Sequence, residues 1–349
     1  MEKPSYIFSS DGQPQFSGFL GGVILIALFE FALAWAPRER VLGAPFDHLG
    51  LSLKSEVADS GGDFDALFLG DCIGWVGIKP SVIEKRTGAT SYNFCVNVRQ
   101  TLALPYLMLR RYLENSRQAP RLVVVQVSTL SFLSRVTLSW ENLESYILPY
   151  FRVEQDLLAE LEPTVRTRLR ERSWQLAIPS VRSQFILREP LWLLKMFRDQ
   201  PEFDRYRRYF RDERGHFIQD PSSSAKEAPT VDRIPGLVEP ELNFQECLTN
   251  FNYLEKIFEL CRVHDIRVAL ASSPEREDRF ELLEQHGVLN RLQRRFRSLV
   301  EPGRAEVFWD LSQSVSQMSY YMDEVHLTSE GADLYSKALS DSIATLDGF

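Results

Sequence analysis

The chain has 349 residues, 44% of them hydrophobic, which is enough to bury a substantial core in one large domain or two modest ones. Its 48 acidic and 40 basic side chains give a formal net charge of −8, so no excess of Lys and Arg exists to neutralise phosphates and we expect no nucleic acid partner. The four cysteines are too few and too unevenly spaced for a disulfide scaffold, and no zinc-binding pattern is present. We therefore expect neither a metal nor a cofactor.

The strongest compositional break lies at residues 16–36, where a run of 21 residues carries one charge, Glu30. This length is sufficient to span a bilayer, so we predict a tail at 1–15 followed by a transmembrane anchor at 16–36. A cleaved signal peptide is the alternative, because Ala34-Trp35-Ala36 resembles a cleavage site. The length of the apolar run, the scarcity of basic residues before it and Pro37 directly after it favour the uncleaved anchor.

After a connector at 37–63, an apolar run at 64–69 predicts a buried strand that enters the tight turn Gly70-Asp71-Cys72. Helix and strand patterns then alternate as far as residue 138. The further elements expected in this stretch are a helix at 81–86 ended by Gly88, a strand at 91–96, a helix at 102–113 and a strand at 122–125. This alternation predicts a parallel sheet with helices on both faces, formed in its first part by residues 64–138.

The strand and helix alternation stops at 139–243, where we find amphipathic helical stretches and no convincing buried strand. We predict an insertion of mainly helical character. The alternation resumes over 244–349, which we assign to the second part of the core. The elements expected there are a helix at 244–264, a strand at 266–271, a helical stretch at 275–300 with a possible break at Gly287, a strand at 306–311 and a final helix at 329–346.

Three predicted loops at the carboxyl ends of the strands carry reactive or polar side chains, and such loops converge at one edge of an open parallel sheet. They contain Cys72 after the first strand, Asn93 to Asn97 at the second, and Asp323 with His326 before the last helix. A thiol becomes an effective nucleophile when a base accepts its proton and a third group holds that base in one tautomer. The sequence therefore predicts Cys72 as nucleophile, His326 as base and Asp323 as the group that orients the base.

The same residues carry a resemblance to a known family. The segment Phe68-Leu69-Gly70-Asp71-Cys72 resembles the Gly-Asp-Ser block of the SGNH (GDSL-like) hydrolases, and the segment that begins Asp323-Glu324-Val325-His326 is similar to their terminal Asp-x-x-His block. The resemblance covers about 60–135 and 244–346. It implies an α/β fold with a three-layer, flavodoxin-like parallel sheet, a helical insertion and an N-terminal transmembrane helix.

Three departures from the family pattern surround this site. Cys72 stands in place of the family serine, so the family role transfers as a thiol nucleophile. Cys95 falls where the family has a glycine whose backbone N–H, with that of residue 72, binds the oxyanion. Leu130 falls where the family has an asparagine, and Asn97 is the residue that we expect to replace that side-chain donor.

The layout is most similar to the membrane-anchored bacterial branch of the family, whose members accompany membrane-bound O-acyltransferases and move acyl groups onto cell-surface polymers. The resemblance implies an acyl donor or acceptor such as an acylated glycan as substrate, and a domain outside the cytoplasm, anchored in the bacterial inner membrane. The charges around the anchor, Lys3 before it and Arg38 and Arg40 after it, slightly favour the opposite orientation. Because the resemblance implies an extracytoplasmic domain and the charge bias is small, we expect the domain on the periplasmic side of the membrane.

Two alternatives stay open from the sequence. The chain can be an SGNH-like scaffold without catalytic activity, a binding or assembly subunit of a membrane complex that modifies polysaccharides. Cys95 can also be a purely structural thiol, or it can form a disulfide with Cys72 that would block catalysis. The remaining histidines and cysteines have no context that indicates chemistry, and we expect structural or surface roles for His48, His216, His264, His286, Cys247 and Cys261.

Overall fold

The computed structural model describes residues 23–28, 46–97, 101–133, 143, 147, 163–172, 200–217 and 246–349. These residues form an α/β fold around one sheet of five parallel strands in the order β2-β1-β3-β4-β5. The strands are β1 (Ala66–Leu69), β2 (Ser91–Asn93), β3 (Leu122–Val127), β4 (Arg267–Ser272) and β5 (Val307–Trp309). The sequence prediction of an α/β fold with a parallel sheet is confirmed.

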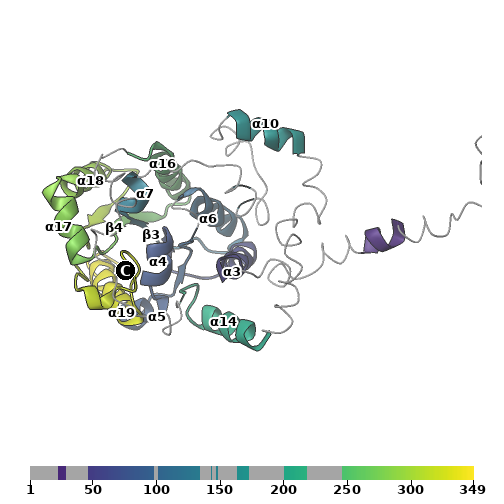
Figure 1. Ribbon diagram of the computed structural model, residues 1–349, viewed down its shortest axis with the longest axis horizontal. Helices are drawn as coiled ribbons and strands as arrows, with labels where there is room; N and C mark the ends of the chain where they lie inside the picture. The colour runs from purple at the N-terminus through teal and green to yellow at the C-terminus, as the bar shows by residue number, and fades with distance from the viewer. Residues whose placement is uncertain are drawn as a thin grey trace, which may run out of the picture.

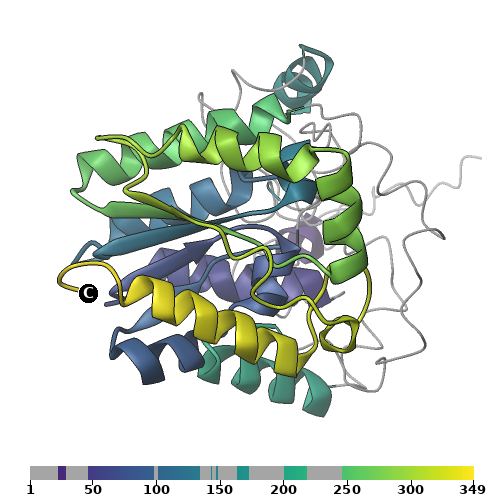
Figure 2. The same cartoon turned by 90° about the vertical axis from the view of Figure 1, so that its left-hand side faces the viewer.

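Helices connect the strands and cover the sheet. Their bounds are α3 (Phe46–Ser60), α4 (Cys72–Gly77), α5 (Pro80–Thr87), α6 (Ala103–Asn115), α7 (Thr129–Leu133), α10 (Pro163–Arg172), α14 (Gln200–Asp212), α16 (Leu248–Val263), α17 (Glu277–Gln285), α18 (Val288–Arg297) and α19 (Ser329–Ile343), with a 3₁₀ turn at Met318–Tyr320. Figure 1 shows these elements along the chain. Figure 2 shows the sheet between the green helices of 248–297 on one side and the yellow helix α19 on the other.

The central strands β1 and β3 are largely apolar on both faces, because each face of the sheet is covered by helices. In β1, Ala66 and Phe68 belong to the cluster of buried side chains that includes α5 and α19, whereas Leu67 and Leu69 belong to the cluster that includes α6, α16 and α18. This alternation follows from the two-residue period of a strand. A continuous apolar run is therefore what a strand in the middle of such a sheet requires, as the sequence predicted.

The strand order reverses between β1 and β3, and open α/β sheets form their sites outside the carboxyl ends of the strands at such a point. The chain leaves β1 at Leu69 and starts α4 at Cys72, and it leaves β3 at Val127 and starts α7 at Thr129. The two turns therefore begin at the same edge of the sheet. The topology places Cys72 next to the reversal of the strand order.

The predicted connector at 37–63 differs from the structure, which has the fifteen-residue helix α3 from Phe46 to Ser60. Its buried positions include Lys54 as well as Leu51 and Leu53, so the apolar spacing that marks a helix in a sequence is interrupted by polar residues. The predicted break at Gly287 is confirmed, because α17 and α18 meet there at a positive φ of 64°.

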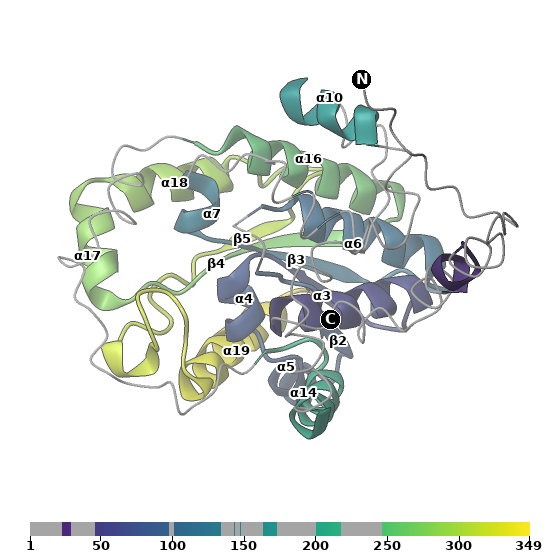
Figure 3. The same cartoon turned by 45° about the vertical axis from the view of Figure 1, so that its right-hand side comes forward.

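Two regions of the prediction are described only in part. Of the predicted anchor at 16–36 the structure describes a helical segment at 23–28, and none of the helices in the described part of the chain is both long and apolar enough to cross a bilayer. Within 139–243 the described elements include α10 and α14, and Figure 3 shows α14 beneath α5 on the side of the sheet that α19 covers. The remainder of both regions lies outside the described residues.

Candidate active site

The turn between β1 and α4 places Cys72 as the first residue of the helix, half-buried at the edge of the sheet. Asp71 caps the helix, with its Oδ1 accepting from the backbone N–H of Ile73 at 2.9 Å. The capping geometry fixes the direction in which the chain enters α4. The nucleophile candidate therefore stands on a turn that its own neighbour holds in place.

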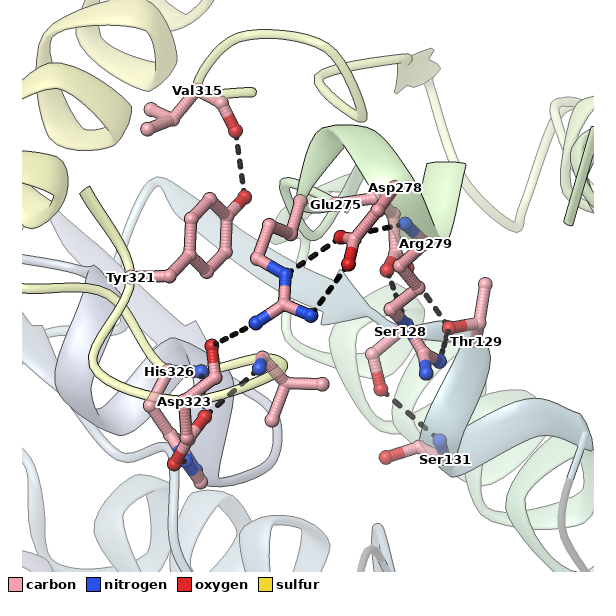
Figure 4. A network of polar contacts seen from close by, with 12 residues as sticks. Ser128, Thr129, Ser131, Glu275, Asp278, Arg279, Val315, Tyr321, Asp323 and His326 are labelled. Atoms are coloured by element: carbon pink, nitrogen blue, oxygen red, sulfur yellow. Dashed lines mark hydrogen bonds and ion pairs between the residues drawn. The ribbon is translucent and has the colours of Figure 1, made fainter. Parts of the chain in front are cut away.

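The second oxygen of the Asp71 carboxylate binds the end of β3. The hydroxyls of Ser128 and Ser131 both donate to Asp71 Oδ2, and Asp71 is only 3% exposed. A buried carboxylate without hydrogen bonds would be strongly destabilising, and here hydroxyl and amide donors satisfy it. The Asp71 side chain thus joins the two turns on either side of the strand-order reversal. Figure 4 includes Ser128 and Ser131 at the start of α7.

Asp323 and His326 form a compact loop before α19 (Figure 4). The His326 Nδ1–H donates to Asp323 Oδ2 at 2.7 Å, and the backbone N–H groups of Val325 and His326 donate to Asp323 Oδ1 at 2.9 and 2.7 Å. The carboxylate is therefore oriented by three donors from its own loop. Because Nδ1 is held by Asp323, Nε2 is the ring nitrogen that remains for a further partner.

Cys72 is the neighbour with which this ring interacts, because a hydrogen bond between the two side chains lowers the pKa of the thiol and raises that of the imidazole. The structure thus brings Cys72, His326 and Asp323 together in the order thiol, imidazole, carboxylate. This arrangement is the one that activates a thiol, since the ring can exchange a proton with sulfur while the carboxylate holds the ring in one tautomer.

The electrostatics of the pair set its protonation at neutral pH. Burial raises the pKa of the Cys72 thiol above its ordinary value, and the hydrogen bond with His326 offsets part of this rise. Burial lowers the pKa of the His326 ring, but the hydrogen bonds and the charges of Asp323 and Cys72 outweigh it, so that this pKa lies well above its usual range. Each partner thus favours the charged form of the other, so that a proton leaving the thiol is taken up by the ring.

The Asp323 carboxylate remains ionised in this setting. Burial would raise its pKa, but the hydrogen bond and the charge of His326 bring the pKa below the ordinary value of an aspartate. The charge of the loop is therefore balanced, with the carboxylate next to the imidazolium.

Cys95 is the residue whose backbone N–H the resemblance implies as an oxyanion donor. Its backbone N–H donates to Asn93 Oδ1 at 2.9 Å, so this donor already has an acceptor within its own turn. The Asn93 side-chain amide in turn donates to the carbonyls of Gly74 and Ile78 at 2.9 and 2.8 Å. This network closes the β2 turn against α4 and leaves the Cys95 amide facing Asn93.

The Cys95 side chain is fully buried next to the turn between β1 and α4, and burial strongly raises the pKa of its thiol. A Cβ atom placed on Gly74 would lie 2.7 Å from Cys95 Sγ, and one on Gly70 would lie 3.1 Å from it. The glycines therefore make room for the thiol. All four cysteines are free, so the alternative of a disulfide between Cys72 and Cys95 is not found.

The two remaining oxyanion positions differ from each other. Leu130 is a buried apolar side chain, as expected from the sequence. Asn97 is exposed to solvent at the end of the described segment 46–97, and the residues that follow it lie outside the description, so its role as a donor stays a prediction. Over the described part of the chain, no group of His, Cys, Asp and Glu side chains is arranged to hold a metal ion.

Sequence reasoning placed Asn93 in one of the polar loops at this edge, but it did not identify Ser128, Ser131 or the buried Arg276, which contact the residues of the site. Ser128 and Ser131 directly follow β3, so the rule that chemistry gathers at the carboxyl ends of the strands could have indicated them. No comparable signal marks Arg276, because an arginine in a charged run usually lies on the surface.

Comparison with known proteins adds little to this geometry. One family model, of an uncharacterised family, matches residues 239–346, well under half of the chain. This segment contains α16 to α19 and with them Asp323 and His326. No curated protein matches the sequence.

Proposed function

We propose that this chain is an SGNH-type enzyme with a flavodoxin-like core, and that it transfers or hydrolyses acyl groups through Cys72, His326 and Asp323. The observation that carries the proposal is the His326 ring, which bonds to Asp323 through Nδ1 at 2.7 Å and interacts with the Cys72 thiol. The three side chains come from segments about 250 residues apart in the sequence. A structural role for the Asp323–His326 loop does not require a thiol at that place.

In this mechanism the Cys72 thiol gives its proton to the neutral His326 ring, and the sulfur attacks the carbonyl carbon of an acyl donor, forming a C–S bond while the π electrons of the carbonyl move onto its oxygen. The tetrahedral intermediate collapses to a thioester on Cys72, and the imidazolium of His326 gives its proton to the departing oxygen. A hydroxyl of the acceptor, or water, then attacks the thioester while His326 takes its proton, and the C–S bond breaks. The Cys72 backbone N–H, which as the first amide of α4 has no intrahelical acceptor, is the donor nearest to the developing oxyanion.

The substrate class and the location follow from the resemblance to the membrane-anchored branch of the family. We assign the acyl group to a cell-envelope polysaccharide or a related polymer, and a membrane-bound O-acyltransferase is the partner that such a system would use. The apolar run at 16–36 would hold the domain at the bacterial inner membrane, on the periplasmic side.

A specific observation favours a second candidate, an inactive scaffold subunit of such a complex. The Cys95 amide is bound to Asn93, and an apolar side chain stands at Leu130, so two donors of the family oxyanion site are missing. Removing one oxyanion donor lowers kcat by roughly 100- to 1000-fold in a well-studied protease, so the loss of two is a severe handicap.

The experiment that separates the two candidates measures alkylation of Cys72 by a small reagent between pH 6 and pH 10, in wild type and in His326→Ala. Because the ring lowers the thiol pKa, the variant should react more slowly at each pH, with its profile displaced to higher pH. The buried Cys95 and Cys261 are internal controls that should stay slow in both proteins. Identical profiles would contradict a working pair.

Acylation provides the positive test of activity. Wild type incubated with an activated ester such as p-nitrophenyl acetate should gain one acetyl group on Cys72, detected by mass spectrometry of the peptide. Cys72→Ala should gain none at this position, and His326→Ala should gain it far more slowly. If the alkylation profile of Cys72 depends on His326 but several activated esters fail to acylate Cys72, the inactive scaffold is favoured.

A further inference from the structure

Arg276 is an arginine with no exposed surface, located where the chain leaves β4 and begins α17. A buried charge is tolerated only when it is paired and its donors are satisfied. Its Nε and Nη2 donate to the two oxygens of Asp278 at 2.6 and 2.7 Å, which is a bidentate pair. The guanidinium plane is therefore fixed by the first turn of its own helix.

The third nitrogen of this fixed guanidinium reaches the candidate active site. Arg276 Nη1 donates to the backbone carbonyl of Asp323 at 3.2 Å, as can be followed in Figure 4 between Asp278 and Asp323. The Asp323 side chain is oriented by its own loop, so the contact with Arg276 fixes the loop as a whole relative to α17. This bond therefore joins Arg276 to the loop that carries His326.

A second anchor supports the same loop from the other side. Tyr321, which precedes it, is buried and donates from its hydroxyl to the carbonyl of Val315 at 2.6 Å. The backbone N–H of Met322 donates to the carbonyl of His326 at 2.8 Å, which closes the loop on itself. Because this bond closes the loop, Asp323 and His326 shift together, and loss of the contact at Asp323 would also displace the His326 ring.

We propose that Arg276 is a positioning residue of this site: with its other nitrogens bound to Asp278, it holds the Asp323 carbonyl and so keeps the His326 ring within reach of the Cys72 thiol. The inference rests on the proposed pairing of Cys72 with His326. Arg276 acts through position rather than through its field, because Asp278 balances its charge. The charged groups that act on the thiol itself are His326, Asp71 and Asp323.

The test is Arg276→Lys in the full chain, with the pH profile of Cys72 alkylation as readout. A lysine keeps the charge but has one nitrogen on a flexible stem, so it cannot bind Asp278 through two bonds and hold the Asp323 carbonyl as well. The profile should move toward that of His326→Ala, with alkylation slowed by about threefold or more at a fixed pH, which corresponds to half a pKa unit.

Arg279→Lys is the matched control. Arg279 is as buried as Arg276 and lies on the same helix, but it donates to Glu275 at 2.7 Å and to Thr129 at 2.8 Å. The control should lose a similar amount of thermal stability and keep the wild-type alkylation profile. An equal shift in both lysine variants would assign the effect to general loosening and overturn the inference.

The variants also separate the two proposals. If His326→Ala leaves the profile of Cys72 unchanged, the proposed function fails; if His326→Ala shifts it and a folded Arg276→Lys does not, only the positioning role fails. Should Arg276→Lys not fold, Asp278→Asn loosens the same pair while it keeps Arg276. A smaller shift in the same direction would then support the inference, and an unchanged profile would refute it.

Discussion

The close packing of the Cys95 side chain against Gly74 in α4 provides a test of the structure around Cys72. In Gly74→Ala, the new Cβ would lie 2.7 Å from Cys95 Sγ and 3.0 Å from Gln126 Oε1, well inside the contact distance of about 3.5 to 4 Å between heavy atoms. Overpacking of a buried site costs roughly 1 to 3 kcal/mol. Replacing a glycine inside a helix by alanine gains at most about 1 kcal/mol, so the clash should win and the variant should be less stable.

The effect of Gly74→Ala on the free energy of unfolding should change sign when the Cys95 thiol is removed. In Cys95→Ala the Sγ atom is gone, and the atoms that remain close to the new Cβ are Gln126 Oε1 at 3.0 Å, at the end of a side chain, and the Cβ of residue 95 at 3.3 Å. Within the described structure, the buried Gln126 amide has no hydrogen-bond partner, so it can shift without breaking a bond. We therefore expect Gly74→Ala to be neutral or stabilising in the Cys95→Ala background, although Cys95→Ala alone costs about 1 kcal/mol for its lost contacts.

The assay is urea unfolding of wild type, the two single variants and the double variant, followed by tryptophan fluorescence. The coupling energy from this cycle should be about 1 to 2 kcal/mol in favour of the double variant. If the stability changes of the two single variants add to within ~0.5 kcal/mol, Cys95 does not occupy the space beside Gly74. The steric reason given for glycine at this position would then be wrong.

Three other outcomes can be checked by simpler measurements. Asp323→Asn removes the carboxylate that raises the pKa of His326 in the folded protein. A folded-state pKa above the unfolded-state pKa of about 6.5 stabilises the protein fully below pH 6.5, and this stabilisation is lost as the pH rises through the folded-state pKa. The difference in Tm between wild type and Asp323→Asn should thus be largest near pH 6 and shrink toward pH 10, and a constant difference would count against it. Burial lowers the pKa of His216 to about 3, so wild type should lose stability as the pH falls from about 6.5 toward 3, by up to ~1.4 kcal/mol per unit, and His216→Gln should flatten this slope; an equal slope in both would refute it. Deletion of residues 1–36 should release the protein from membranes, whereas soluble mature protein that begins at Pro37 would indicate a cleaved signal peptide.

The sequence was sufficient for the parallel sheet, and it indicated that Cys72 and the Asp323–His326 pair would lie at one edge of it. A central strand that is covered on both faces appears in the sequence as an apolar run, and β3 is the clearest example. The ends of parallel strands lie at one edge, which is why Cys72 and the Asp323–His326 pair could be expected to meet. Gly287 ends a helix because its φ is positive, where glycine is favoured.

The parts that the sequence did not reveal depend on polar groups that pack inside. Helix α3 buries Ser52, Lys54 and Ser55 along with its leucines, so its pattern did not resemble an amphipathic helix. Lys54 lies 5.3 Å from the centre of the Trp75 ring, and its ammonium donates to the carbonyl of Cys95. Such contacts join distant segments, and no local pattern records them. The same holds for Arg276, which looks like a surface residue in a run of charges.

The occupation of the Cys95 amide shows why the reactive residues alone do not decide between catalysis and binding. A family motif predicts which backbone atom should face the oxyanion, but the direction of an N–H depends on the acceptors around it. Here Asn93, two residues earlier, provides an acceptor at 2.9 Å and turns the donor inward. Among the described residues, the proposed mechanism then relies for the oxyanion on the first amide of α4 and the charge of the nearby imidazolium, with Asn97 as a further predicted donor. A thiol tolerates this loss better than a serine, because it needs less assistance to become a nucleophile. For the proposed acyl transfer, a thiol at residue 72 and a reduced set of oxyanion donors are therefore compatible features, and together they favour an acyl donor that is already activated.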